Sequence, residues 1–233
     1  MSTSESDPPD LPWPKPAAPS LEVSRAIREG CTRGLSQKRC VPVSHRLLAS
    51  LALSFGVFGL LAFLTRANPR IDGTFRAALI GAAGWGIVQA MILWVGLARP
   101  PGKRFSARVR LVLAVLTPVI FLGYVAHAAP QWVSFFEFSH GERAAHAVRC
   151  TVVGLAFSAV ISGGVLLLWR GTDPLTPGLT GALVGLVGGL AGGLTIGVAC
   201  PSQEGWHACF SHGLGALAFA GIGWAAGRRL LVP

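Results

Sequence analysis

The sequence predicts an all-α membrane protein, a polytopic helical bundle of about six transmembrane helices with both termini in the cytoplasm. Of its 233 residues, 52% are hydrophobic and only 13% are charged, whereas soluble domains carry nearer a quarter charged residues because their surface faces water. The apolar residues come in blocks of about 20, the length of a helix that crosses a hydrocarbon layer of about 30 Å. The thirty glycines agree with this class, since glycine is more frequent in membrane helices than in soluble ones.

The N-terminal region, residues 1–45, is predicted to be a cytoplasmic tail. Residues 1–19 are rich in Pro, Ser and Asp, a composition that predicts disorder. Residues 20–37 predict a short amphipathic helix with Ser20 as its N-cap. The apolar residues that recur at helical spacing in this segment are Leu21, Ile27, Cys31 and Leu35.

The remainder of the chain, residues 46–233, is predicted to form the transmembrane domain. Its apolar blocks lie at about 47–65, 77–98, 109–129, 148–169, 178–199 and 210–227. The residues before Leu47 are polar, so no cleavable signal peptide is expected and the first block serves as an uncleaved span.

Lys and Arg are divided unevenly between alternate connections of the predicted bundle. Fifteen lie in the N-terminal region, the second and fourth loops and the C-terminus: Lys15, Arg25, Arg28, Arg33, Lys38, Arg39, Arg46, Arg99, Lys103, Arg104, Arg108, Arg110, Arg170, Arg228 and Arg229. The other loops hold five: Arg66, Arg70, Arg76, Arg143 and Arg149. Because cytoplasmic loops carry the excess of positive charge, both termini are placed in the cytoplasm. The net charge of +10 is then a topology signal, and no direct binding of nucleic acid is expected.

The fifth apolar block has a glycine at every fourth position. These residues are Gly181, Gly185, Gly189, Gly193 and Gly197. On a helix they form one bare ridge, along which the backbone of another helix can approach closely. Such a ridge can join two copies into a homo-oligomer or pack inside one bundle, and we expect the second arrangement.

Reactive side chains gather on the predicted outer face. Cys150 opens the fourth block, Cys200 closes the fifth, and Cys209 lies nearby; the histidines on or near this face are His127, His140, His146, His207 and His212. A Cys150–Cys200 disulfide could form in an oxidising compartment if the two Cα atoms lie within about 7 Å. Alternatively, the thiolates with His207 or His212 could bind a soft metal ion such as zinc or copper. The structural alternative is that the cysteines are small buried hydrophobes and the histidines are interfacial.

No catalytic arrangement is found in the sequence, and an enzyme is not expected. The chain has no phosphate loop, HExxH or GxSxG motif and no paired carboxylate inside a predicted span. A secondary transporter normally needs polar groups near the midplane, and Gln89 is the main polar residue inside a block. The alternative function is a small transporter or a membrane protein that handles metal or haem. Its candidate ligands are the outer histidines His127, His146, His207 and His212.

Three features near the predicted outer face carry a resemblance to a known family. These are Cys150 at the start of the fourth span, the Ala199-Cys200-Pro201 corner that closes the fifth, and His207 with the Ser211-His212-Gly213 opening of the sixth. In these features, and in its short polar N-terminus and six compact spans, the chain resembles the NrsF-type membrane anti-sigma factors. The resemblance covers roughly residues 20–230.

The resemblance implies a bacterial inner-membrane protein that sequesters an extracytoplasmic-function sigma factor. It further implies that Cys150 and Cys200 sense an envelope signal and that the sigma factor is then released. Cys209 and the histidine-rich outer loop lie outside the family pattern, so metal, redox and light-linked signals all stay open.

The contact with the sigma factor is predicted in the amphipathic N-terminal segment. Its apolar residues Leu21, Ile27 and Leu35 would present one face to a groove of the partner. The arginines of the same segment equally allow it to lie on the membrane surface.

Overall fold

The structure of the chain is a computed structural model. It describes residues 20–25, 29, 41–65, 75–97, 105–128, 137, 139, 141–173, 175–200, 202 and 204–232. The chain divides into two compact units, Met1–Val41 and Pro42–Pro233.

The described residues of the first unit begin a helix. The side-chain oxygen of Ser20 accepts a hydrogen bond from the backbone N–H of Val23 at 3.3 Å, which is the arrangement of an N-cap. Leu21 follows with its side chain exposed. Ile27 and Leu35, the other apolar residues of the predicted sigma-factor contact, lie outside the described residues.

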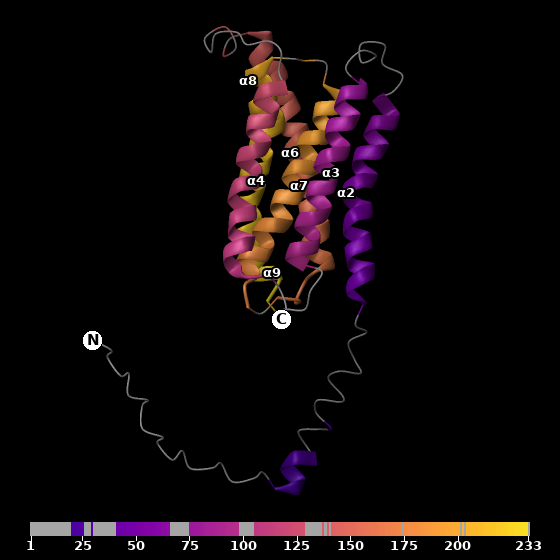
Figure 1. The fold of residues 1–233 in the computed structure, drawn as a ribbon, viewed down its shortest axis with the longest axis vertical. Coiled ribbons are helices and arrows are strands. Elements are labelled where there is room, and N and C mark those ends of the chain that lie inside the picture. The colour runs from indigo at the N-terminus through magenta and orange to yellow at the C-terminus, as the bar shows by residue number, and fades with distance from the viewer. Residues whose placement is uncertain are drawn as a thin grey trace, which may run out of the picture. The chain divides into compact units, whose positions relative to one another are not determined.

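The described part of the second unit is a bundle of long helices (Figure 1). They are α2 (Val43–Thr65), α3 (Phe75–Leu97), α4 (Ala107–Ala128), α6 (Glu142–Leu168), α7 (Pro177–Ala199), the short α8 (Gly205–His207), the π-helix η3 (Ala208–Gly213) and α9 (Leu214–Leu230). Six segments are long and apolar enough to cross a membrane, the last of them formed by α8, η3 and α9 in succession. The prediction of an all-α bundle with about six spans is therefore confirmed.

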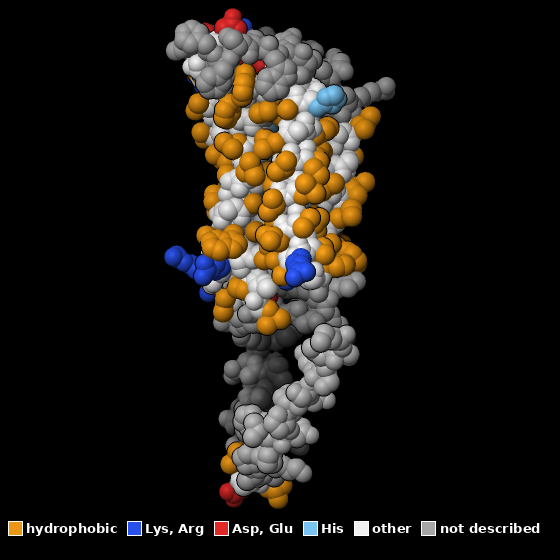
Figure 2. Space-filling model, turned by 60° about the vertical axis from the view of Figure 1, so that its left-hand side comes forward, with side chains coloured by type: hydrophobic (Ala, Val, Ile, Leu, Met, Phe, Trp, Pro, Cys, Tyr) orange, Lys and Arg blue, Asp and Glu red, His pale blue; other side chains and the backbone are white. Residues whose placement is uncertain are grey.

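The outer surface of the bundle is apolar, as a lipid-facing surface requires. Figure 2 shows a band of hydrophobic side chains on one face, with Lys and Arg gathered at its lower margin. On α4, for example, Leu111, Val115 and Val119 are each more than half exposed. An apolar surface of this extent would be a liability in water, so lipid is the environment that the fold needs.

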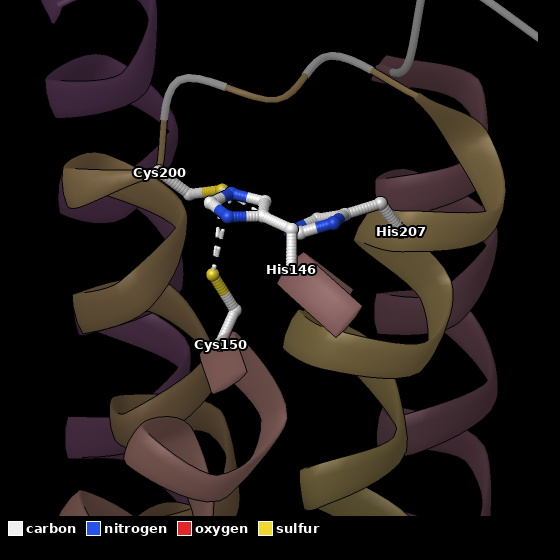
Figure 3. A group of neighbouring side chains, drawn as sticks. All are labelled: His146, Cys150, Cys200 and His207. Atoms are coloured by element: carbon white, nitrogen blue, oxygen red, sulfur yellow. Dashed lines mark hydrogen bonds between the residues drawn. The ribbon is translucent and has the colours of Figure 1, made fainter. Parts of the chain in front are cut away.

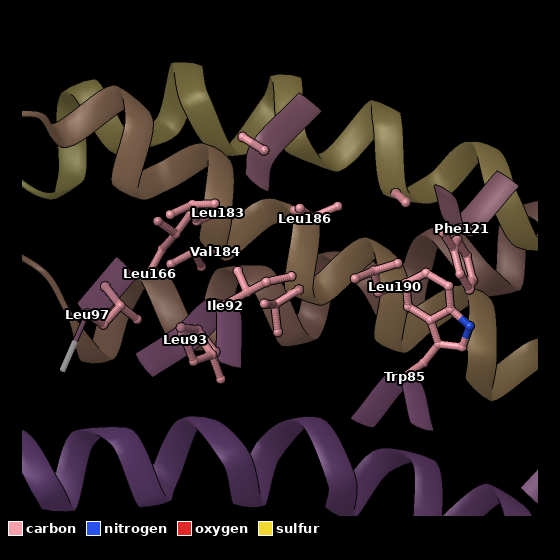
Figure 4. Close-up of a cluster of buried hydrophobic side chains, with 14 of the residues drawn as sticks. Trp85, Ile92, Leu93, Leu97, Phe121, Leu166, Leu183, Val184, Leu186 and Leu190 are labelled. Atoms are coloured by element: carbon pink, nitrogen blue, oxygen red, sulfur yellow. The ribbon is translucent and has the colours of Figure 1, made fainter. Parts of the chain in front are cut away.

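Helix α7 is the central element of the bundle. In its span Pro177–Val198, 89% of the residues are buried, against 11% to 50% in the other five spans. It packs against α2, α3, α4, α6 and α9, and Figure 1 shows it among them. Its leucines join α3 and α6 in a buried hydrophobic cluster (Figure 4), whose labelled members include Ile92, Leu93, Leu166, Leu183, Leu186 and Leu190.

The glycine ridge of α7 lies directly against η3 and α9. A Cβ atom added at Gly181, Gly185, Gly189 or Gly193 would come within 3.0 Å of backbone atoms of Gly223, Phe219, Gly215 or His212. The fit is reciprocal, because a Cβ at Gly223 or Gly227 would meet the α7 backbone. A Cβ atom added at Gly197 would lie nearest to a side-chain atom, Nδ1 of the His212 ring, at 3.5 Å. The ridge is thus covered by α9 and, at Gly193 and Gly197, by η3 of the same chain.

A second glycine face on α7 contacts α6. A Cβ at Gly188 or Gly192 would lie within 3.0 Å of backbone or hydroxyl atoms of Ser162 or Ser158. Both serines are buried. Because glycine has no side chain, two faces of α7 carry no side-chain atoms at these positions. The backbones of α6 and α9 can therefore both approach α7 closely.

Substituting alanine for Gly185 is expected to lower the free energy of unfolding by about 1 to 3 kcal/mol, the usual effect of overpacking a core. The new methyl group would meet the Phe219 carbonyl group, which belongs to the backbone and cannot rotate away. The measurement is reversible unfolding in detergent micelles. Gly163→Ala on α6 is the matched control, since a Cβ there meets nothing within 4 Å. Equal stabilities of the two variants would contradict the close α7–α9 contact.

A buried polar network lies at the N-terminal end of α7. Arg110 of α4 is 4% exposed, Asp173 of the α6–α7 connection 0% and Thr180 of α7 0%. Thr180 Oγ1 accepts a hydrogen bond from Arg110 Nη1 at 3.2 Å and donates one to Asp173 Oδ2. Asp173 Oδ1 also accepts the backbone N–H groups of Leu175 and Thr176 at 3.2 and 3.1 Å. The network therefore joins α4, the α6–α7 connection and α7.

Candidate metal centre

The opposite end of α7 contributes to a cluster of four side chains, His146, Cys150, Cys200 and His207 (Figure 3). His146 and Cys150 are four residues apart on α6, so they lie on the same face one turn apart. Cys200 follows the last residue of α7 in an extended conformation, with φ −85° and ψ 124°. His207 comes from α8, after the chain has turned back toward α6.

The potential ligand atoms of these four residues all lie within 4.8 Å of one another. The two sulfur atoms, Cys150 Sγ and Cys200 Sγ, are 3.8 Å apart. His146 Nε2 lies 3.7 Å from Cys150 Sγ and 3.8 Å from Cys200 Sγ. His207 Nε2 lies 3.1 Å from Cys200 Sγ.

These separations match a tetrahedral metal site. Zinc bonds of about 2.3 Å to sulfur and about 2.0 Å to nitrogen place two sulfurs about 3.8 Å apart and sulfur and nitrogen about 3.5 Å apart. The cluster thus needs only small adjustments to enclose an ion. The sulfurs are farther apart than the about 2.05 Å of a disulfide, and both cysteines are free thiols in the structure.

The four side chains of the cluster differ in their exposure to solvent. His146 is exposed, Cys150 and Cys200 are half-buried, and His207 is 1% exposed. Burial, reinforced by the nearby Cys150, raises the pKa of the Cys200 thiol to about 12, although a backbone hydrogen bond at Ser202 acts in the opposite direction. At neutral pH Cys200 is therefore protonated, and a metal ion must displace that proton to bind.

An ion pair and hydrogen bonds near the cluster join helices that carry its residues. Arg143 at the start of α6 pairs with Glu204 beside α8 at 3.2 Å. Ser211 Oγ of η3 donates a hydrogen bond to the Ala147 carbonyl oxygen at 2.9 Å and accepts one from Thr151 Oγ1 at 3.2 Å. These links hold α6 against α8 and η3, so the donors of the two sides are brought together before any ion binds.

His212 lies directly behind the cluster. Its ring meets the His207 ring edge to face, with centroids 5.4 Å apart. Of the buried side-chain nitrogen and oxygen atoms in the described residues, His212 Nε2 alone lacks a hydrogen-bond partner. His212 belongs to the π-helix η3, and single π-turns inside α-helices are frequent at functional sites.

The structure brings together three of the residues selected from the sequence, Cys150, Cys200 and His207, and places His212 beside them. Cys209 is a half-buried free thiol on η3 and is not one of the four donors. The fourth donor is His146, which the sequence analysis considered only as a haem ligand. The i, i+4 spacing of His146 and Cys150 was the missed signal. His146 and Cys150 lie on one helix only because α6 begins at Glu142, before the start expected near residue 148.

Comparison with known proteins identifies the family of the chain. No curated protein and no solved structure matches the chain. The profile of one family, described as negative regulator of sigma F, matches residues 32–232, which is most of the chain. The chain therefore belongs to the NrsF family of negative regulators of sigma F.

Proposed function

We propose that this chain is an inner-membrane anti-sigma factor whose cluster of His146, Cys150, Cys200 and His207 binds a soft metal ion. The family description supports the role of a negative regulator of a sigma factor. The single observation that supports metal as the signal is the set of donor separations, above all the 3.8 Å between the two sulfurs. The partner is an extracytoplasmic-function sigma factor, and the protein acts by binding rather than by catalysis.

The donor set favours zinc or copper(I). Two thiolates and two imidazoles in a tetrahedron suit ions without a preference for planar coordination, and thiolate sulfur selects soft ions. The exposed His146 gives an ion a route from solvent to the half-buried sulfurs. Oxidation of the same two thiols to a disulfide is the competing signal, and it would require the sulfurs to approach by more than 1 Å.

The signal would pass along α7. An ion bound by Cys150 of α6 and Cys200 at the end of α7 would fix these two helix ends relative to each other. The glycines of α7 make close backbone contact with α6 and α9, and tightly packed helices shift between discrete arrangements rather than deforming gradually. A change at the cluster would therefore alter the far end of α7, where Thr180 joins Asp173 and Arg110.

The distribution of Lys and Arg supports a topology with both termini and the far end of α7 in the cytoplasm. The cluster would then face the envelope side of the membrane. The N-terminal segment of Leu21, Ile27 and Leu35 would lie in the compartment that holds the sigma factor, where it would form the contact.

Affinity purification of the tagged, detergent-solubilised full chain is expected to retain a sigma factor, which mass spectrometry identifies. A second version that lacks residues 1–45 is expected to lose it. Retention by both versions would move the contact to the loops of the bundle. If neither version retained a sigma factor while both eluted as folded proteins, the anti-sigma role would be refuted.

Haem binding is a second candidate because three imidazole rings lie in successive contact. The His146 and His207 rings are stacked with centroids 5.0 Å apart, and His212 follows at 5.4 Å. Bound haem would give the purified protein a Soret band that replacement of His146 or His207 removes. A colourless protein that binds zinc would exclude this candidate.

A further inference from the structure

We propose that a groove between α4 and α9 binds an anionic phospholipid, with the acyl chains along the groove and the phosphate at its basic end. The groove is independent of the cysteine and histidine cluster. It has a volume of about 460 Å³ and is lined by three helices. Leu111 and Val115 form the α4 wall, Ala220 lies on the α9 side, and Leu179 and Ala182 of α7 form the floor.

The lining of the groove suits hydrocarbon. All the residues just named are apolar, and the two α4 side chains are each more than half exposed. Small side chains at Ala182 and Ala220 leave the space between the larger ones. The groove opens on the lipid-facing surface of a membrane-spanning unit, where acyl chains are the molecules present to fill it.

One end of the groove is basic and aromatic. Arg108 of α4 and Trp224 of α9 belong to its lining. Arg228, one turn beyond Trp224, places its guanidinium carbon 4.8 Å from the centroid of the indole ring. Both arginines are exposed, and no carboxylate among the described residues forms an ion pair with them.

The positive charge of this end, and its position near the level of the lipid headgroups, suit a lipid phosphate. Guanidinium groups bind phosphate through paired N–H donors, and tryptophan favours the level of the headgroups. The first turn of α4 also lies at this end, where Ser106 Oγ accepts the Val109 N–H at 3.4 Å, and the N-terminus of a helix favours anions. On the predicted topology this is the cytoplasmic side, where basic pockets between helices bind anionic headgroups. Phosphatidylglycerol is a lipid with this chemistry.

The test is native mass spectrometry of the detergent-solubilised full chain, titrated with phosphatidylglycerol or with phosphatidylcholine of the same acyl chains. Phosphatidylglycerol is expected to bind at least about tenfold more tightly. Arg108→Gln with Arg228→Gln is expected to weaken its binding by roughly tenfold or more, since the double substitution removes both positive charges from the end of the groove that faces the headgroup. Arg170→Gln, an exposed arginine on the α6–α7 connection outside the groove, is the matched control and is expected to bind like the wild type.

Equal affinity for the two lipids would overturn the proposal because binding would then not depend on the charge of the headgroup. An equal loss in the Arg170→Gln control would also overturn it, because binding would then follow the overall charge of the protein. Glycerol phosphate has the headgroup phosphate but no acyl chains, so it tests whether the chains contribute to binding. If it displaced the lipid at a similar concentration, a role for the groove would be refuted. A second measurement needs no arginine variant. Phosphatidylglycerol with brominated chains is expected to quench tryptophan fluorescence more in the wild type than in Trp224→Phe, and equal quenching would count against the site.

Discussion

Replacing Cys150 and Cys200 together by serine is expected to weaken the binding of zinc or copper(I) by more than about a hundredfold. Loss of a hydrogen-bond partner outside the coordination shell already weakens metal sites by about 10- to 100-fold, and this change removes both sulfur donors of the cluster. The measurement is competition of the purified protein against a chromophoric chelator. Cys209→Ser is the matched control, because Cys209 is half-buried and free but is not one of the four donors.

The same titration should depend on pH in a defined direction. The folded protein holds the pKa of Cys200 at about 12, so between pH 6 and pH 8 the thiol is fully protonated before metal binds. Each bound ion then releases at least that one proton, and the apparent affinity falls by about tenfold or more for each unit by which the pH is lowered. Affinity that did not change with pH, or a double variant that bound as tightly as Cys209→Ser, would refute the metal centre.

Asp173→Ala is expected to lower the free energy of unfolding by about 3 kcal/mol or more, the size of effect seen when one partner of a buried charged network is removed. The carboxylate is fully buried and accepts the N–H groups of Leu175 and Thr176 as well as the hydroxyl of Thr180. Its loss leaves these donors unpaired, and Thr180 also loses the acceptor that orients it toward Arg110.

Asp173→Asn is the matched variant for this prediction. It keeps an acceptor oxygen for the two N–H groups but removes the charge, so its stability is expected to lie between those of the wild type and Asp173→Ala. Unfolding in detergent, followed by circular dichroism, measures all three proteins. If Asp173→Ala unfolded like the wild type, the network would not stabilise the fold.

The number of spans could be predicted from sequence because it depends on run length and hydropathy alone. Which span lies at the centre could not, because lipid tails and helix neighbours are equally apolar and select the same residues. In the α7 span 89% of the residues are buried and in the α6 span only 33%, although both spans are strongly apolar, with mean hydropathies of 1.8 and 2.2. The two glycine faces of α7 were the available signal, and only the face with glycine at every fourth position was recognised.

The candidate site was accessible to sequence analysis only in part. Topology alone placed Cys150, Cys200 and His207 on one side of the membrane. The distances between them depend on where α6 begins and on how the chain returns after Cys200, and neither can be deduced from composition. The network of Arg110 and Asp173 was missed for a related reason. Arg110 was counted with the cations of a solvent-facing loop and Asp173 was not considered, whereas both side chains are buried.

The position of α7 has a consequence for biosynthesis. The ribosome completes α2, α3, α4 and α6 before α7 exists, yet each of them packs against α7. The first four spans therefore enter the membrane without the element around which they assemble, and the tertiary structure forms only late in translation. Helix α9, whose backbone fits the glycines of α7, emerges last. A nascent chain interrupted before Pro177 would therefore lack the helix against which all four earlier spans pack.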